Sequence, residues 1–493
     1  MKRRKFIKNT AVASSVVILP PFVNLEKAPY FGNGIHNGWA DQNSITIWTR
    51  LTENPELNSN GKPFIKLTLD EQKKFADLNN IAVLEGSQIP KNLALKDMEG
   101  ACPGTSGEVQ LSYYEDNNPS SKIIMDWAKV DASKNFTKQW KLSNLNSDTR
   151  YLIEITSRKT SESNSTNRIK GEFTTPADSE VIKNISFGIV SCHDFNRRDH
   201  KNGHRIYPAM EKNKLDFFIH TGDIEYYDKP NPYAYTESLM RFKWDRIFAL
   251  PLQRRFYNKT TSYFMKDDHD TLKDDAFPGT RYGAVSFDRG IEIFDKEQFP
   301  SNNKTYKTIR WGKDLQVWLL EGRNYRSRNT DPDGPEKHIL GKEQREWLFE
   351  TINKSDATFK VLVSASPIIG PDRPKGKNDN HSNKAYQHEG NIIREFVKKH
   401  DNLYMCNGDR HWQYVSHIED TNLWEFCSGS GSDSHAGGWE QENVLPQHKF
   451  LRVKGGYLTG NIFRDNEIVK LKFTHRDVDG NTVHEKVFSR NLV

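Results

Sequence analysis

The sequence lacks a long apolar run after its first twenty residues. Its mean hydropathy is −0.80, and no later segment approaches the roughly 20 apolar residues that a helix needs to cross a bilayer. We therefore expect no transmembrane span in the mature chain. At 493 residues the chain is also longer than one hydrophobic core usually supports, which predicts more than one domain.

The chain also has little net charge once its amino terminus is set aside. The first 28 residues carry six Lys or Arg and one Glu, a net of +5, so +1 of the formal +6 remains for the rest. A basic platform for nucleic acid is therefore not predicted, and we expect no nucleic-acid partner.

The amino terminus itself has the organisation of an export signal. A basic segment at residues 2–8 precedes a modest apolar run at residues 11–20. The adjacent Arg3 and Arg4, followed by Phe6 and Ile7, resemble a twin-arginine (Tat) signal, the alternative being an ordinary basic terminus. We expect residues 1–28 to be the signal peptide, the Tat export machinery to be a partner of the precursor, and the mature protein to be periplasmic or secreted.

Cysteine is scarce, with four residues in the whole chain. In an oxidising compartment Cys102, Cys406 and Cys427 could include a disulfide, and buried free thiols are the alternative. The fourth, Cys192, belongs to a motif described below.

Residues 29–176 have the pattern of a small all-β domain. Apolar and polar residues alternate with a period of two at residues 44–51, 63–69, 149–156 and 169–175, which predicts strands there. The segment that leads into Tyr151 resembles the turn before a strand of a fibronectin-type β-sandwich. A polar break at residues 176–180 predicts the domain boundary.

Residues 177–493 alternate strands with helices, which predicts an α/β (α+β) domain with sheets flanked by helices. Strands are expected at residues 185–190, 217–219, 358–366 and 402–406, and helices at 207–214, 341–352 and 389–399. Asp479-Gly480 predicts a hairpin turn near the carboxyl end. In such folds the carboxyl ends of the strands form the edge at which sites lie.

Residues with metal-binding chemistry follow four apolar runs of this second region. The four groups are Ser191-Cys192-His193-Asp194, Gly222-Asp223 with Tyr226, Asp267-Asp268-His269-Asp270, and Gly408-Asp409-Arg410-His411. A single Gly-Asp pair is most often a solvated turn. Four such groups, each directly after an apolar run, favour a shared metal site, because solvated charges have no reason to gather at strand ends.

The order of these motifs resembles the calcineurin-like metallophosphoesterases. Cys192 stands where most of that superfamily has Asp-x-His. With this substitution and the other three motifs together, the sequence resembles the alkaline phosphatase D (PhoD-like) family within the superfamily. Residues 340–348 and the order of the two regions match the same family. The resemblance implies a metallophosphoesterase sandwich of sheets flanked by helices, preceded by a fibronectin-like β-sandwich.

The resemblance also implies Fe(3+) and Ca(2+) as cofactors. Cys192, Asp223 and Tyr226 would hold the ferric ion, because thiolate and phenolate suit its charge. Asp223 would bridge to calcium, for which carboxylate oxygens are natural ligands. Asp409 and His411 would complete the cluster.

Two further acidic residues are expected near calcium. Asp268 matches a metal-binding Asn of the superfamily. Asp274 stands where many relatives carry Asn, and it could still ligate calcium while adding negative charge near the phosphate.

The remaining candidates concern the substrate. His269 matches the superfamily His that faces the scissile phosphate, and we expect it to be catalytic together with Asp223. Arg323 and Arg326 are candidate clamps for phosphate oxygens, a solvated loop being the alternative. His435, in a Gly- and Ser-rich run, could line the mouth of the pocket, but a flexible loop is the expectation.

These features predict a monomeric phosphatase that hydrolyses small phosphate mono- or diesters by a metal-activated water. One alternative is a phospholipase D-like phosphodiesterase of the same family. Another, from a different class, is a binding or adhesion protein on a degenerate phosphoesterase scaffold, which would purify without stoichiometric iron.

Overall fold

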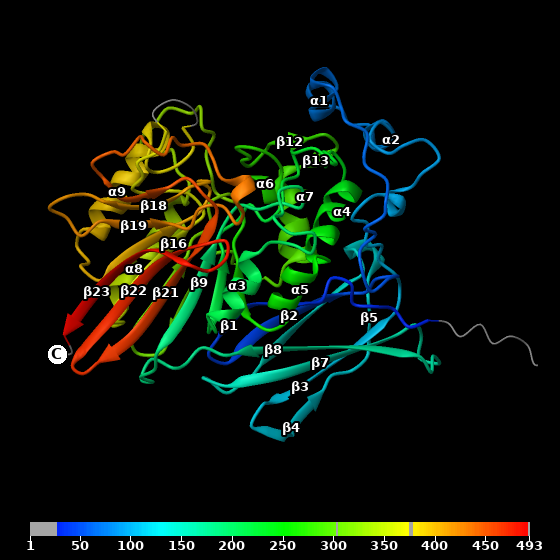
Figure 1. Cartoon of the computed structure of the whole chain (residues 1–493), viewed down its shortest axis with the longest axis horizontal. Helices are drawn as coiled ribbons and strands as arrows, with labels where there is room; N and C mark the ends of the chain where they lie inside the picture. The colour runs from blue at the N-terminus through cyan, green and yellow to red at the C-terminus, as the bar shows by residue number, and fades with distance from the viewer. Residues whose placement is uncertain (1–26, 302–303, 374–377, 492–493) are drawn as a thin grey trace, which may run out of the picture.

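The computed structural model describes residues 27–301, 304–373 and 378–491. Residues 1–26, which hold nearly all of the expected Tat signal, lie outside these ranges. Two large mixed sheets lie side by side at the centre of the molecule, and helices lie on their outer sides (Figure 1).

The first central sheet has six strands in the order β11-β10-β9-β21-β22-β23. Its strands are β9 (Ile185–Val190), β10 (Phe217–His220), β11 (Thr261–Phe264), β21 (Gly456–Asp465), β22 (Ile468–Asp477) and β23 (Thr482–Asn491). Neighbours among β9, β10 and β11 run parallel, whereas β21 pairs with β9 in the antiparallel sense. The hairpin expected at Asp479-Gly480 is confirmed, because β22 and β23 pair around it.

The second central sheet has seven strands in the order β14-β15-β16-β17-β19-β18-β20. Its strands are β14 (Lys307–Trp311), β15 (Leu315–Leu319), β16 (Phe359–Ser364), β17 (Leu403–Asn407), β18 (Gln413–His417), β19 (Trp424–Cys427) and β20 (His448–Arg452). Strands β15, β16, β17 and β19 form a parallel core with antiparallel strands at both sides.

Alternate residues of the central strands enter different cores. On β10, Phe217 and Ile219 belong to the core shared with Val361 and Val363 of β16, so this core lies between the two sheets. The intervening Phe218 belongs to a separate core with the helices of the first sheet. Strands buried on both faces explain the continuous apolar runs in the sequence.

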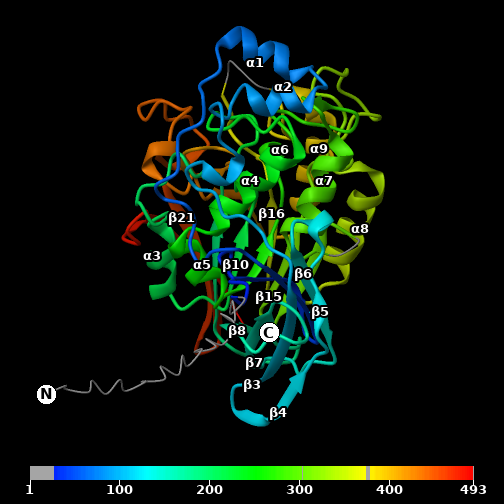
Figure 2. The ribbon, with the colours of Figure 1, turned by 90° about the vertical axis from the view of Figure 1, so that its right-hand side faces the viewer.

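Helices cover the outer face of each sheet (Figure 2). Those packed on the first sheet are α3 (Ile206–Lys212), α4 (Glu237–Phe248) and α5 (Pro251–Tyr257). Those packed on the second are α8 (Gly341–Lys354) and α9 (Gln387–Val397). Shorter elements near the first sheet are α6 (Asp268–Thr271), β12 (Arg281–Tyr282), β13 (Val285–Ser286), α7 (Phe287–Glu292) and a π-helical turn at Ile293–Gln298.

The amino-terminal region contributes two smaller antiparallel sheets. One contains β1 (Ile35–Asp41), β2 (Ser44–Arg50) and β6 (Thr137–Ser143), and the other contains β3 (Glu108–Glu115), β4 (Asn118–Ile124), β5 (Ala128–Lys129), β7 (Arg150–Arg158) and β8 (Thr166–Thr174). Their apolar residues, such as Ile47 and Ile153, join the same core as Ile189 of β9. The division of the chain between residues 176 and 177 stays a prediction.

The strand expected at residues 63–69 is wrong. Residues 63–68 are not in a strand, and Leu69 begins helix α1 (Leu69–Ala76). Thr68 and Glu71 form a capping box, each accepting a backbone N–H of the other, and this local signal outweighs the alternation. Helix α1 and the following α2 (Ile81–Gly86) project from one end of the molecule (Figure 1).

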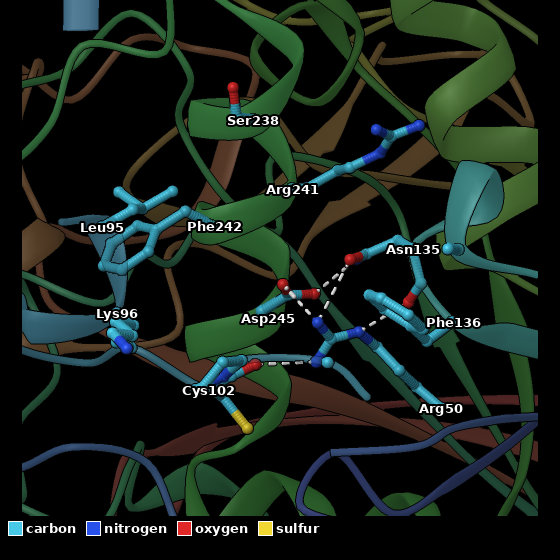
Figure 3. A pocket seen from close by; sticks show the side chains of 14 residues that line it. Arg50, Leu95, Lys96, Cys102, Asn135, Phe136, Ser238, Arg241, Phe242 and Asp245 are labelled. Atoms are coloured by element: carbon cyan, nitrogen blue, oxygen red, sulfur yellow. Dashed lines mark hydrogen bonds and ion pairs between the residues drawn. The ribbon is translucent and has the colours of Figure 1, made fainter. Parts of the chain in front are cut away.

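A pocket of about 280 Å³ lies between the amino-terminal region and α4 (Figure 3). Arg50 lies on its wall and forms an ion pair with Asp245 at 2.9 Å. Its remaining N–H groups donate to Asn33, Cys102 and Asn135, so every guanidinium donor is used within the protein. Arg50 therefore fastens the amino-terminal region to α4.

All four cysteines are buried free thiols in this structure, which agrees with the second of the two alternatives given for them above.

Among the described residues, no helix combines the length and the apolar character that crossing a bilayer requires.

Candidate metal centre

The four motifs meet where the carboxyl edges of the two central sheets adjoin. In the first sheet Val190, His220 and Phe264 end three strands that pair in parallel register, so the residues that follow them emerge together. In the second sheet Asn407 ends β17. The backbone N–H of Asp409 donates to Ser191 Oγ at 3.1 Å and ties the two edges together.

Two glycines permit this close approach. A Cβ on Gly222 would lie 2.7 Å from Cβ and N of Asp267, and a Cβ on Gly408 would lie 2.2 Å from the hydroxyl oxygens of Ser191 and Thr221. Both contacts are far shorter than carbon atoms tolerate. Glycine is therefore required at both strand ends for the motifs to meet.

Three predicted ligands have a left-handed backbone. The φ angle is +47° at Cys192, +56° at Asp223 and +64° at Asp409. For residues other than glycine this conformation costs about 1–2 kcal/mol each. Such strain persists where the surrounding structure enforces it, and it gathers at functional sites.

The predicted ligand atoms lie within reach of shared cations. In the described part of the chain, three groups of ligand atoms each fit within 4.8 Å: Cys192 with Asp223 and His411, Asp223 with Asp268 and His269, and Asp223 with Asp267 and Asp409. Asp223 belongs to all three. This arrangement suits a carboxylate that bridges neighbouring ions.

Tyr226 completes the first group. Its hydroxyl lies 2.9 Å from Asp223 Oδ2 and 3.2 Å from His411 Nε2, and its side chain is buried. Cys192 Sγ lies 3.5 Å from the same Asp223 oxygen. Thiol, phenol, carboxylate and imidazole therefore converge on one point.

The electrostatics of the cluster favour the binding of cations. Burial, together with neighbouring carboxylates, raises the pKa of Asp223 and of Asp409 well above the usual range. Burial and nearby acids likewise raise the pKa of the Cys192 thiol and the Tyr226 phenol, and burial lowers the pKa of His411 to about 3. Bound cations would reverse these preferences and favour the ionised ligands.

Two buried carboxylate oxygens point to the same conclusion. Asp223 Oδ1 and Asp267 Oδ2 have no hydrogen-bond partner among the described residues. An unpaired buried oxygen is costly in a protein interior, whereas a cation satisfies it directly. The donor set therefore fits metal ions.

His269 lies beside this cluster. Its Nδ1 is 2.6 Å from Asp228 Oδ1, its Nε2 is 3.6 Å from Asp274 Oδ1, and its ring packs 4.2 Å from that of Tyr226. Burial lowers its pKa, but the carboxylates of Asp228, Asp268 and Asp223 outweigh burial and raise the pKa to about 10. Because His269 also belongs to one ligand group, its assignment to the substrate rests on the family resemblance.

Arg323 and Arg326 are both buried, so the solvated-loop alternative is wrong. Arg323 Nε donates to Asp267 Oδ1 at 2.6 Å, and its Nη2 lies 3.5 Å from Asp268 Oδ1, inside the acidic cluster. Arg326 instead donates to Asn329 and to the backbone carbonyl of Asp379, in the loop that follows β16. The structure thus brings Arg323, and not Arg326, against a predicted ligand, Asp268.

Asp274 lies at the margin of the site. Its side chain is 44% exposed, and it belongs to none of the ligand groups found among the described residues. Its role as a calcium ligand stays a prediction.

Sequence reasoning missed three acidic residues. Asp267 joins Asp223 and Asp409 in one ligand group. Asp228 bonds His269, and Asp270 accepts the backbone N–H groups of residues 223–225, which holds that loop in place. The Asp-Asp-His-Asp run was a visible signal, but spacing alone does not say which of its carboxylates faces the ions.

The flexible loop expected at His435 from its Gly- and Ser-rich surroundings is wrong. His435 ends a short 3-10 turn (Asp433–His435), is 3% exposed, and packs 4.3 Å from the His411 ring and 5.0 Å from the Tyr226 ring. The run is fixed because Gly431 donates its backbone N–H to the Cys192 carbonyl at 3.0 Å. Tertiary hydrogen bonds here outweigh local composition.

Comparison with known proteins identifies relatives of this architecture. A family model described as PhoD-like phosphatase matches residues 293–479. Alkaline phosphatase D of Bacillus subtilis (strain 168) is 23% identical over 301 residues, and the match covers 50% of this chain and 49% of that protein. The match therefore spans about half the length of this curated relative.

Solved structures share the fold at low sequence identity. A structure of PhoD superposes with a TM-score of 0.69 at 16% identity, covering 95% of this chain and 91% of the other. Purple acid phosphatase from yellow lupin seeds superposes with a TM-score of 0.60 at 9% identity, covering 94% and 75%. The chain thus matches the PhoD-like phosphatase model over residues 293–479 and shares the fold of PhoD over 95% of its length.

Proposed function

We propose that this chain is an exported, metal-dependent hydrolase of phosphate mono- or diesters. The observation that carries the proposal is the position of Asp223, which belongs to every ligand group at the junction of the two sheets. The match of residues 293–479 to a PhoD-like phosphatase family model and the two unpaired carboxylate oxygens support the same conclusion.

The ligand atoms divide into two kinds around Asp223. Cys192, Tyr226 and His411 offer sulfur, phenol oxygen and nitrogen, which suit Fe(3+). Asp267, Asp268 and Asp409 offer carboxylate oxygens, which suit Ca(2+). Bound at this point, such ions would supply Lewis acidity and an activated water for attack on phosphorus.

The protein's own groups would orient the ester and manage protons. His269 is held by Asp228 at Nδ1, and its Nε2, which lies 3.6 Å from Asp274 Oδ1, would donate to the departing oxygen. Arg323 holds Asp267 and Asp268 in position through its guanidinium. This arrangement favours positioning of two ligands over direct clamping of phosphate by Arg323.

The test combines metal analysis with a colour measurement. Purified protein should contain iron, hydrolyse a chromogenic phosphate ester, and absorb visible light through phenolate-to-iron charge transfer. Tyr226→Phe should shift or remove the band, while Tyr227→Phe should not, because the Tyr227 hydroxyl instead bonds Trp244 Nε1. A colourless wild type with full iron would contradict the iron assignment.

A catalytically dead scaffold makes a different prediction. It would purify without stoichiometric metal and would hydrolyse neither mono- nor diesters after reconstitution. Either ester hydrolysed in a chelator-sensitive way excludes that alternative, and the ratio of the two rates defines the preference.

We also propose the export route and the domain arrangement expected from the sequence. Twin-arginine export predicts that replacing Arg3 and Arg4 with Lys retains the precursor in the cytoplasm, and normal export of that variant would contradict it. The two amino-terminal sheets support a fibronectin-like β-sandwich at residues 29–176, followed by the phosphoesterase domain at residues 177–493.

A further inference from the structure

Two side chains outside the ligand groups border the Tyr226 side of the metal centre. The guanidinium carbon of Arg197 lies 5.1 Å from the centre of the Tyr226 ring. The ring of His435 lies 5.0 Å from that of Tyr226 and 4.3 Å from that of His411. Neither residue has a role in the arrangement described above.

Arg197 is held rigidly at this place. Its Nε and Nη2 both lie 2.7 Å from Asp194 Oδ2, and its backbone N–H donates to Asp194 Oδ1. The Arg197 side chain is 30% exposed, and its Nη1 has no partner among the described residues. One edge of a fixed guanidinium therefore remains available to bind an acceptor.

His435 adds unsatisfied nitrogen atoms to the same wall. Its side chain is 3% exposed, yet neither Nδ1 nor Nε2 has a hydrogen-bond partner among the described residues. A histidine ring carries at least one N–H donor in either tautomer. A buried polar nitrogen without a partner needs an explanation, and a bound ion or water is one.

The two residues are fastened to each other through the backbone. Ser432 Oγ and Ser434 Oγ donate to the carbonyl oxygen of Arg197 at 2.7 and 2.5 Å. The loop after β9 and the turn that carries His435 thus form one wall, although they are distant in sequence. This wall is built in advance of any ligand.

We propose that Arg197 and His435 form a subsite for an oxyanion of the substrate, beside the Tyr226 face of the metal centre. The inference rests on the proposed function, since it places a phosphate ester at that centre. The oxyanion is either an oxygen of the scissile phosphate or a second acidic group of the same substrate. Charge-assisted donation from a fixed guanidinium is well suited to both.

Binding of two uncleavable phosphonates tests the subsite without any hydrolysis. Phenylphosphonate carries one acidic group and carboxyphenylphosphonate carries two. Both are titrated into metal-loaded wild type, Arg197→Ala and His435→Leu by calorimetry, with metal content measured for each protein. Loss of one charge-assisted hydrogen bond predicts about ten- to a hundredfold weaker binding for Arg197→Ala and a smaller loss for His435→Leu.

Arg255→Ala is the matched control. Arg255 also makes a two-bond contact with a carboxylate, that of Glu211, but its side chain is 50% exposed and lies outside the site. It should bind both phosphonates as wild type does. If Arg197→Ala lowers the metal content, Arg197→Lys keeps the charge without the planar fork, and the same comparison is made with that variant.

The pattern of loss identifies the source of the oxyanion. Equal weakening for both phosphonates assigns the subsite to the phosphate itself, and weakening only for the carboxylated probe assigns it to a second acidic group. Unchanged binding of both probes in both site variants overturns the proposal. Because no hydrolysis is measured, a wild type that cleaves no ester but loses phosphonate binding with Arg197 would refute the proposed activity and leave the subsite standing.

Discussion

The two sheet edges that meet at the metal centre differ in the charge they supply. The first edge delivers Asp223, Asp267 and Asp268 from adjoining parallel strands. The second edge delivers Asp409 and two arginines, Arg323 after β15 and Arg410 after β17. Arg323 pairs with Asp267 of the first edge, and Arg410 pairs with Asp409. The carboxylates of the first, acidic edge would repel one another strongly on their own, and packing of the two sheets offsets part of this repulsion through Arg323.

The largest expected effect comes from removing the shared carboxylate of the acidic edge. Asp223→Asn replaces the one carboxylate common to all three groups with a neutral amide, so metal content and hydrolysis should fall together. Losing several kcal/mol of electrostatic stabilisation predicts about a thousandfold lower rate. Metal analysis and a chromogenic ester assay measure both quantities.

Asp216→Asn is the control for this change. Asp216 lies just before β10, at the opposite end of the strand from Asp223, and its carboxylate accepts the Ser186 backbone N–H. This variant should keep metal and activity. Near-normal turnover in Asp223→Asn would sink the bridging assignment.

A second test separates substrate chemistry from metal binding at the acidic edge. His269→Ala should lose about a hundred- to ten-thousand-fold in rate, the usual range for a general acid, while keeping its metals. The loss should be smaller for nitrophenyl esters, whose leaving groups need no proton. Parallel rate and metal measurements decide between the two roles, and loss of metal would assign His269 to the ligands.

The third test removes positive charge from the second edge. Arg323→Met leaves Asp267 and Asp268 buried without their cation, so unfolding of the metal-free protein should become easier by about 3–5 kcal/mol. Denaturant unfolding measures the change. Arg150→Ala, which breaks an exposed pair with Asp116, should cost no more than about 1 kcal/mol. Equal costs for the two variants would show that Arg323 does not balance the acidic cluster.

The smallest expected effect concerns the buried carboxylate of Glu389, because hydrogen bonds from the second half of the molecule offset the cost of burying its charge. Burial raises the pKa of Glu389, but hydrogen bonds from His381 and from the backbone N–H groups of Ile339 and Leu340 outweigh it and lower the pKa to about 2. A lowered folded-state pKa stabilises the protein above pH 4.5, and this contribution is lost as the pH falls through about 2.

The contribution amounts to about 3 kcal/mol at most, and denaturant unfolding at pH 6 and pH 3 measures the roughly 2 kcal/mol of it that is lost over this interval. Glu389→Gln should flatten the dependence of stability on pH over this range. An unchanged slope would show that other acids dominate it.

The sequence predicted the central strands and many of the residues that the structure brings together at their ends, because both depend on local patterns. Apolar runs marked β9, β10 and β17, and the residues directly after them include Cys192, Asp223 and His411. Contacts that depend on tertiary packing could not be predicted from the sequence. The contact of Arg323 with Asp267 and the burial of His435 depend on loops that approach one another only in the folded chain.

The placement of β21 has a consequence for how the chain folds. This strand comes from near the carboxyl end, yet it pairs directly with β9, whose end carries Cys192. Contacts between such distant segments form slowly, because a long loop must close before they are made. During synthesis β9 therefore lacks one neighbour until almost the last residues have been added, and a chain truncated before Gly456 would leave that edge open to aggregation.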